Sequence, residues 1–475
     1  MFFLNRLNGW SSNAVKLNPV GSKNDIAPSS LIEVELPQNT LVDLKSFAMN
    51  FSCVFDGNAT TIPPRWFPQT MIRRVEVQVN GITMSAGANN YNVVWNMLAE
   101  CTTPEDFARY SALNMGGQPS GTLPILTADV ALNAGGNDFT PTFSATNWIG
   151  FLGSSQWLNT GLLGSVRVRI QLDSAAVMSQ LENNGDATYT LSNLDFTCMV
   201  ASLDDGLYQQ ALLERLASGS QVSYPFKSYY TFEQQNAGGN GSLKGTLSSS
   251  SVDRVTALIR ASNYNTQALL SAQTTTYLGG TTPYFTACGG GTFVAAAINQ
   301  QLAGIDAART TAELNSWQFL VNSNYSPNYL VHCKNTEGKG GLSALETRRS
   351  YGTGHDVTSG DHLNYNACGQ YPYTSGVAGH NCFGPAQGGG AAAAINRANQ
   401  FQQQWNYKNY HCYCSIPLEY VGAEDRLVSG SNFRGSVGVI FFNFETSAHA
   451  NNTMMIVECT SVLKIGAGGS AELIV

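Results

Sequence analysis

The sequence predicts an all-β protein made of two β-sandwiches in tandem, each of about eight strands. The chain has 475 residues, which is too long for one ordinary domain and suits two domains of similar size. Apolar and polar residues alternate with a period of two in many short stretches of both halves. A strong helix signal stands almost halfway along the chain, where a connection between two sandwiches is expected.

The first half begins with residues 1–27, which lack regular periodicity and predict an irregular N-terminal arm. Strands are expected after it, and the clearest is 166–173, where Val and Ile residues alternate with Arg and Gln. Asn80-Gly81 follows an alternating stretch and predicts a tight hairpin turn. The expected strands are 31–37, 40–55, 74–79, 82–85, 166–173 and 187–203, the last as two short strands or one bent strand.

Helical signals are few. Residues 91–100 and 104–113 predict short helices within a connection. Residues 204–217 give the strongest signal, because Leu212 and Leu216 are spaced four apart and Gly219 follows as a stop. This helix would close a first domain over residues 28–218 and lead into a second domain over residues 219–475.

The second half repeats the strand pattern, at 222–232, 242–249, 254–261, 409–420, 434–445 and 452–465. A long irregular region separates these strands at about 263–404, with a helix expected at 391–405. No charged residue occurs from Ala261 to Ile305. Uncharged loops of this length are expected to contact other protein rather than to stand free in solvent.

Charged residues make up only 12% of the chain, against roughly 25% in typical soluble proteins. So little charge on a folded chain suggests a surface that is largely covered by neighbouring subunits. The net charge is −7 and no run of Lys or Arg occurs, which argues against a basic tail and against sequence-specific nucleic-acid binding. We expect no secretion signal and no membrane span, and therefore free thiols at the ten Cys.

Motifs for catalysis and for phosphate or dinucleotide binding are absent from the sequence, so we predict no catalytic residue, no cofactor and no enzyme activity. The carboxylate pair Glu33 and Glu35 is expected on the wet face of a strand, and Asp204 and Asp205 at the start of the central helix. The aromatic residues between positions 224 and 232 could stack bases or sugars, but a strand core explains them better; they are Tyr224, Phe226, Tyr229, Tyr230 and Phe232.

Histidine and cysteine are concentrated in the second half and raise the question of a metal site. The six His are His332, His355, His362, His380, His411 and His449, and the Cys among them are Cys333, Cys368, Cys382, Cys412 and Cys414. Their spacing matches no established zinc or iron pattern. We therefore predict no metal.

Several stretches resemble the double-jelly-roll major capsid proteins of polinton-like viruses, virophages and larger DNA viruses. They include LPQNTLVDL at 36–44, RVEVQVNG at 74–81, NYNVVWNML at 90–98, the stretch 189–200 with its following helix, SSVDRVTALIR at 250–260, and the closing strands 437–445 and 454–465. The resemblance covers about residues 28–465. It implies that each predicted sandwich is a jelly roll, with 1–27 as an arm and 263–404 as tower-like loops of the second roll.

The resemblance also implies a function and partners. Such proteins form homotrimers that act as pseudo-hexagonal capsomers and tile an icosahedral shell around a double-stranded DNA genome. Neighbouring capsomers, penton and minor capsid proteins and, as a further candidate, an internal membrane would be the partners. The chain would reside in the virion capsid after assembly inside the host cell. Deleting residues 1–27 would leave a folded trimer but impair shell assembly.

Three other interpretations compete with this one. The first is a carbohydrate-binding or adhesive β-sandwich protein, which would expose aromatic residues around a shallow site. The second is an enzyme on a β-sandwich, which needs a convergent acid and base set. The third is a penton or minor coat protein, which usually has a single roll and is disfavoured by the length of the chain.

Overall fold

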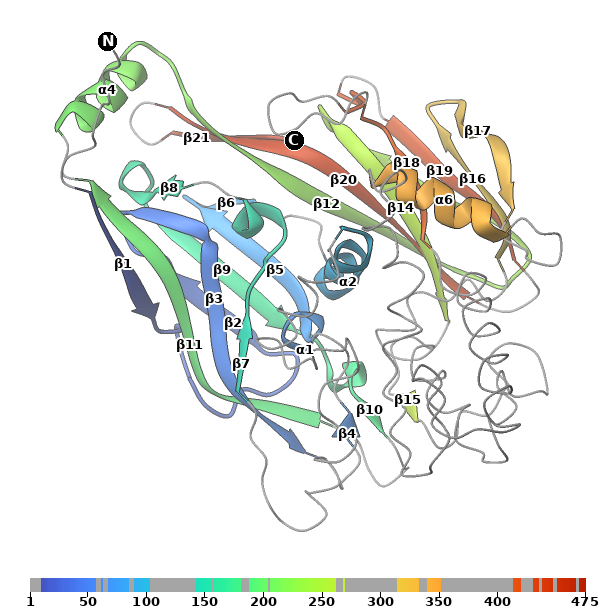
Figure 1. The fold of residues 1–475 in the computed structure, drawn as a ribbon, viewed down its shortest axis with the longest axis horizontal. Helices are drawn as coiled ribbons and strands as arrows, with labels where there is room; N and C mark the ends of the chain where they lie inside the picture. The colour runs from blue at the N-terminus through green and yellow to red at the C-terminus, as the bar shows by residue number, and fades with distance from the viewer. Residues whose placement is uncertain are drawn as a thin grey trace, which may run out of the picture.

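The computed structural model describes residues 10–56, 61–62, 67–84, 89–102, 142–154, 157–180, 188–203, 206–261, 268–269, 314–332, 340–351, 413–419, 430–434, 438–446, 451–466 and 470–475. Within these residues the chain forms two β-sandwiches that lie one after the other (Figure 1). The prediction of an all-β, two-sandwich protein is confirmed.

The first sandwich consists of a five-stranded and a four-stranded antiparallel sheet. The five-stranded sheet has the order β1 (Trp10–Leu17), β11 (Thr188–Leu203), β3 (Leu41–Asp56), β7 (Thr142–Ala145), with β8 (Trp157–Asn159) also on β3. The four-stranded sheet has the order β2 (Leu31–Glu35), β9 (Val166–Leu172), β5 (Ile72–Val79), β6 (Ile82–Thr83). At the β5–β6 turn Asn80 and Gly81 have φ of 49° and 82°, which confirms the predicted hairpin.

The second sandwich repeats this division into five and four strands. Its five-stranded sheet has the order β12 (Val222–Asn236), β20 (Asn451–Ile465), β14 (Val252–Ala261), β18 (Cys414–Pro417), with β21 (Ala471–Ile474) also on β20. Its four-stranded sheet has the order β13 (Asn240–Leu247), β19 (Gly438–Thr446), β16 (Leu314–Val321), β17 (Asn324–His332). A small third sheet joins β4 (Thr61–Ile62), β10 (Ser179–Gln180) and β15 (Ala268–Leu269).

The predicted central helix is α4 (Gly206–Ala217), which leads directly from β11 to β12. It ends in a Schellman motif: Gly219 has a φ of +81°, its N–H donates to Leu216 O, and Ser220 N–H donates to Arg215 O. The other described helices are α1 (Phe67–Thr70), α2 (Tyr91–Thr102), α6 (Gly340–Ser350) and the short 3₁₀ turns η2 (Gly150–Gly153), η3 (Thr160–Leu162) and η4 (Ala175–Val177). The helices expected at 104–113 and 391–405 lie outside the described residues.

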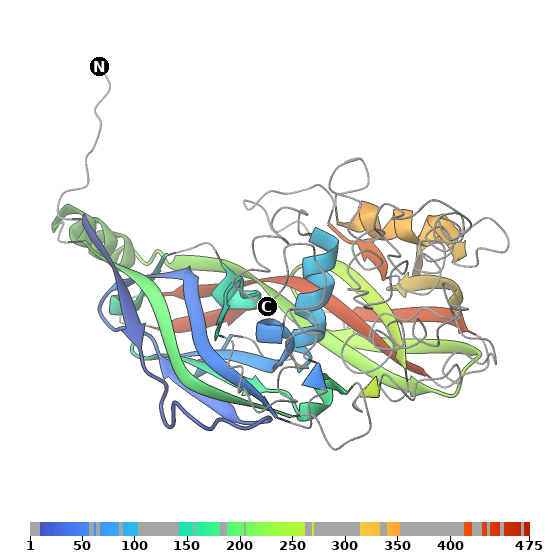
Figure 2. The ribbon, with the colours of Figure 1, turned by 60° about the horizontal axis from the view of Figure 1, so that its bottom comes forward.

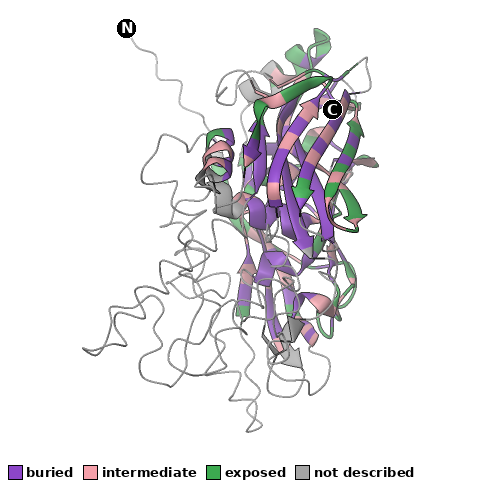
Figure 3. Ribbon diagram, turned by 90° about the vertical axis from the view of Figure 1, so that its right-hand side faces the viewer, coloured by how far each residue is buried: buried purple, intermediate pink, exposed green. Residues whose placement is uncertain are grey.

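The long β12–β20 ribbon runs from one sandwich to the other (Figure 1), and one of its faces contributes residues to both hydrophobic cores. Buried residues run through the strands of both sandwiches (Figure 3). At one end of the ribbon Phe226 and Leu463 lie in the core of the first sandwich. At the other end Phe232 and Val457 pack in the core of the second sandwich. Where the two cores meet, the ribbon carries small polar residues, of which Ser228 hydrogen-bonds to a neighbouring serine on β20. The ribbon therefore fastens the two sandwiches to each other.

The opposite face of this ribbon packs against α2, which stands between the two sandwiches (Figure 2). A third apolar cluster forms there; its buried members are Val93, Val94, Met97, Tyr229, Leu258, Tyr351, Tyr413, Met454 and Ile456. Both faces of the five-stranded sheet in the second sandwich are thus covered along part of its length. This explains why most of β20 is buried on both sides rather than in alternation.

Two expectations about irregular segments were wrong. Residues 10–17, expected within an irregular arm, form β1 along the edge of the first sandwich. The strand has few apolar residues because its outer face is exposed. On its inner face, Val15 and Leu17 are partly buried among the residues whose burial is described. Deleting residues 1–27 would therefore remove a strand and not only an arm.

The second error concerns the region 263–404, which contains β16, β17 and α6. Trp317, Phe319 and Val321 alternate into the core of the second sandwich, so the sequence did hold the signal for β16. Asn322 and Ser323 have φ of 47° and 74° and form the turn to β17 without the usual Asn-Gly pair. The remaining parts of that region lie outside the described residues.

We predict that Phe226→Ala lowers the free energy of unfolding by about 3 kcal/mol, because a buried aromatic side chain is lost from the contact between sandwiches. Phe226 meets Phe151 of η2 edge-on, with ring centroids 5.1 Å apart. Chemical denaturation followed by tryptophan fluorescence measures the change. Tyr325→Ala is the matched control, because Tyr325 is 57% exposed, and it should change stability by less than about 0.5 kcal/mol. Equal effects of the two variants would contradict the shared-core role of the ribbon.

Candidate functional site

The densest group of charged side chains in the described residues lies on the second sandwich, on the face of the ribbon that bears α2. Lys227 comes from β12, Asp253 and Arg254 from β14, Glu458 from β20, and Glu419 from the residues after β18. We call these five residues the junction cluster. It is where a catalytic or binding site would be sought first, because buried titratable groups concentrate at such sites.

A β-bulge in β14 brings its two charged residues to the same cluster. The register with β20 shifts between Val252 and Arg254, so that Asp253 is the inserted residue. In a regular strand two adjacent side chains point to opposite faces. The bulge removes that restriction, and its freed carbonyl, Asp253 O, accepts hydrogen bonds from Leu418 N and Glu419 N.

Every charged side chain in the junction cluster has a partner of opposite charge. Lys227 Nζ lies 2.8 Å from Asp253 Oδ2, 3.0 Å from Glu419 Oε1 and 3.6 Å from Glu458 Oε1. Arg254 donates to Glu458 Oε2 at 2.8 Å. The carboxylate of Asp253, only 1% exposed, also accepts hydrogen bonds from Ser251 Oγ at 2.6 Å and Thr460 Oγ1 at 2.5 Å.

The two cations of the junction cluster stay charged because of these carboxylates. Burial lowers the pKa of Lys227, but Glu458, Asp253 and Glu419 outweigh burial and the net pKa lies above the ordinary 10.5. For Arg254 burial likewise lowers the pKa, and Glu458 outweighs it. Arg254 further donates from Nε to Ser350 O at 2.9 Å and stacks over the Tyr351 ring, 4.1 Å from its centroid. The junction cluster thus joins the end of α6 to β12, β14 and β20. Each of its acidic and basic groups is engaged in an ion pair.

Most candidates named from the sequence have structural roles where they are described. Glu33 is paired with Arg167 and Arg169 at 3.3 and 3.0 Å, on the partly exposed face of the first sandwich. Glu35 accepts a hydrogen bond from Gln38 at 2.9 Å. The expectation that Glu33 and Glu35 lie on the wet face of a strand is confirmed. Asp204 and Asp205 lie outside the described residues.

The aromatic stripe from Tyr224 to Phe232 belongs to the cores, as predicted. Tyr224 and Phe226 are buried in the first core, and Tyr230 and Phe232 pack on the second core. Tyr229 faces the opposite way, into the cluster around α2. None of these five rings is among the exposed large hydrophobic residues.

Metal-ligating side chains can be compared only within the described part of the chain. The residues that the structure describes hold no group of three or more His, Cys, Asp and Glu side chains suited to a metal. Of the six His only His332 is described, at the end of β17. The other His, and Cys333, Cys368, Cys382 and Cys412, lie outside the described residues.

Four cysteines in the described part of the chain are buried free thiols: Cys53, Cys198, Cys414 and Cys459. Burial raises the pKa of Cys198 to about 11 and that of Cys459 to about 12. Thiols with such pKa values stay protonated at neutral pH and are poor nucleophiles.

No described helix is long and apolar enough to span a membrane.

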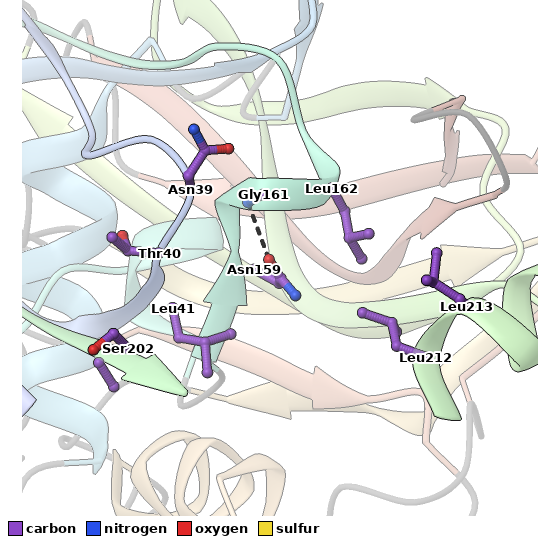
Figure 4. Close-up of a pocket in the computed structure, with 10 residues that line it drawn as sticks. Asn39, Thr40, Leu41, Asn159, Gly161, Leu162, Ser202, Leu212 and Leu213 are labelled. Carbon is purple, nitrogen blue, oxygen red and sulfur yellow. Dashed lines mark hydrogen bonds between the residues drawn. The ribbon is translucent and has the colours of Figure 1, made fainter. Parts of the chain in front are cut away.

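A pocket of about 380 Å³ opens at the end of the first sandwich, beside α4 (Figure 4). Its wall is formed by uncharged residues of the β2–β3 turn, β3, β8, η3, β11 and α4; they are Asn39, Thr40, Leu41, Asn159, Gly161, Leu162, Ala201, Ser202, Leu212 and Leu213. Sequence reasoning missed this pocket, because its wall is assembled from segments far apart in the chain.

Comparison with solved structures identifies the class of fold. No protein-family model and no curated protein matches the chain. The capsid protein VP54 of PBCV-1, fitted into a reconstruction of the virophage Sputnik, aligns with a TM-score of 0.60 at 11% identity, over 100% of this chain and 98% of that one. The Sputnik virophage structure aligns with a TM-score of 0.52 at 10% identity, over 100% and 90%. The Faustovirus major capsid protein aligns with a TM-score of 0.50 at 6% identity, over 97% and 91%.

The chain is therefore an all-β protein of two jelly rolls in tandem. More particularly, its fold is the double jelly roll of viral major capsid proteins, as the sequence resemblance implied. The alignments span nearly the full length of these proteins, so both rolls and their order in the chain are shared. At these identities the likeness establishes the fold, and function is argued separately below.

The junction cluster was not predicted from the sequence, although a signal for it exists. Lys227 stands within an aromatic strand, and Glu458 within the otherwise apolar stretch MMIVECT at 454–460. A charge inside a buried strand calls for a partner of opposite charge. Which residues supply that partner depends on strand pairing, which one sequence does not reveal.

We predict that Lys227→Met lowers the free energy of unfolding by roughly 1–3 kcal/mol near neutral pH, because buried Asp253 loses its cation. The loss is smaller than for a fully buried pair, since Lys227 is partly exposed. A raised pKa means that the contribution of Lys227 is complete below 10.5 and is lost as the pH rises through its folded-state pKa. The difference in the free energy of unfolding between variant and wild type should therefore become smaller in strongly alkaline buffer.

Denaturant titrations at about pH 8 and about pH 11 measure this narrowing. Lys45→Met is the control, because Lys45 is exposed and is not part of the junction cluster. If the loss of unfolding free energy caused by Lys227→Met is the same at the two pH values, the ammonium charge of Lys227 does not stabilise the fold.

Proposed function

We propose that this chain is the major capsid protein of an icosahedral double-stranded DNA virus. Three copies would form one pseudo-hexagonal capsomer, and capsomers would tile the shell. The observation that carries the proposal is the end-to-end alignment with PBCV-1 VP54, which leaves neither chain with an unmatched domain. A capsid role fits such a pair of rolls because six rolls per trimer give nearly sixfold symmetry, which suits packing with six neighbours.

The chemistry of the described residues supports a structural role. Every charged side chain of the junction cluster is paired with one of opposite charge. The thiols of Cys53, Cys198, Cys414 and Cys459 are buried. Of the carboxylate pairs named from the sequence, the described pair Glu33 and Glu35 is engaged in ion pairs and hydrogen bonds. A chain with 12% charged residues is also suited to burying much of its surface against copies of itself. We infer that it is not an enzyme.

The proposed division of labour follows the two rolls. The first roll ends at about residue 218 with α4, and the second runs from residue 219, with the loops of 263–404 as towers. Neighbouring capsomers, penton and minor capsid proteins are the proposed partners, and a membrane beneath the shell is a further candidate. The net charge of −7 and the lack of a basic run argue that the chain does not grip the genome directly.

We predict that the purified protein is a trimer. Size-exclusion chromatography with light scattering should give three times the chain mass of 50.9 kDa, and negative-stain images of the same peak should show hexagonal outlines. The reason is that a single chain would leave its weakly charged surface exposed to solvent, whereas a trimer would bury part of that surface. A stable monomer at micromolar concentration would contradict the capsomer proposal, and a glycan-binding screen would then test the adhesive alternative.

A further inference from the structure

The pocket beside α4 is lined by both apolar and polar uncharged residues. Leu41, Leu162, Leu212 and Leu213 supply the apolar surface, and none of the ten lining residues carries a charge. Leu213 is 65% exposed although it lies beside three other leucines. The volume of about 380 Å³ falls within the range of pockets that hold ligands or side chains of a partner.

The first described residues of the chain lie beside the wall of this pocket. The first residue of β1, Trp10, pairs with Leu203, the last residue of β11. Next to that pair, Ser11 Oγ lies 2.6 Å from Ser202 Oγ, and Ser202 is part of the pocket wall. The described chain therefore begins next to a residue of the pocket wall.

The nine residues that precede Trp10 match the pocket in composition. Their sequence is MFFLNRLNG, with five apolar residues and one charged side chain, Arg6. Phe2, Phe3 and Leu4 are consecutive, and six residues separate Phe3 from Trp10. A chain of six residues reaches about 20 Å when extended, so Phe3 can return to the pocket with slack.

We propose that residues 1–9 dock in the pocket of their own chain, with Phe2, Phe3 and Leu4 against the four leucines. Attachment through β1 keeps the segment at an effective concentration that a separate molecule would not match. Burying exposed leucine against phenylalanine removes apolar surface from water. The docked segment would fasten α4, the connection between the two rolls, to the end of the first roll.

Docking within one chain is a property of the isolated protein and does not depend on the capsid role. If the chain forms no capsomer, the docking can still be observed, and if docking fails, the trimer measurement is unaffected.

Disulfide trapping tests the proposal on the full-length protein. Phe3→Cys is combined with Leu213→Cys, and the matched control combines Phe3→Cys with Arg215→Cys, since Arg215 lies on the same helix, is exposed and does not line the pocket. Single variants control for the native cysteines. Because Leu213 is already exposed, its replacement should leave the fold intact, and circular dichroism of each variant checks this.

After mild oxidation, the first pair should form an intrachain disulfide at least about tenfold faster than the control pair, as expected for groups held together rather than meeting by chance. Non-reducing gels separate intrachain from interchain bonds, and peptide mass spectrometry identifies the linkage. An interchain bond would overturn the proposal in favour of docking on a second copy. Equal rates for the two pairs, or no bond in either, would show that the segment does not occupy the pocket.

Discussion

The rest of the structure depends on one constraint, which is that a single face of the β12–β20 ribbon supplies apolar residues to two separate cores. Fifteen residues of each strand pair without a break in register. Phe226 and Leu463 lie at one end, and Phe232 and Val457 at the other, so neither roll can shift along the ribbon without exposing apolar surface. The two rolls are therefore fixed to each other more firmly than by a flexible linker.

The junction cluster follows from this constraint. Once the inner face of the ribbon is committed to the cores, its outer face is the only place where charged residues of these strands can lie. That face is partly covered by α2 and by Tyr351, which follows α6, so Glu458 is largely removed from water and requires partners of opposite charge. The bulge at Asp253 supplies one of them from β14, and it also anchors the residues that follow β18. The ion pairs of the junction cluster therefore help to keep β12, β14 and β20 in register.

Many strands and turns could be predicted from the sequence alone. Contacts between residues that lie far apart in the chain could not. Alternation located the strand at 166–173, apolar content located the strand at 452–465, and Asn80-Gly81 located a turn, because these signals are encoded within a few residues. Edge strand β1 was missed because a strand that buries only one weak face carries little hydrophobic pattern. The pocket beside α4 and the ion pairs of Lys227 with Glu419 and Glu458 join residues more than a hundred positions apart, and no local pattern specifies such neighbours.

The same reasoning explains why a full-length likeness survives at 11% identity. A jelly roll requires an apolar residue at alternate positions and a turn at each strand end, and many sequences meet both conditions. The additional requirement is that one ribbon serve two cores, which fixes the length and the polarity of β12 and β20 but not the identity of their residues. Loops that make no contribution to either core are free of that requirement. Sequence variation is therefore expected to be concentrated in the loops outside both cores, while the ribbon keeps its pattern of one face for the cores and one face for α2 and the junction cluster.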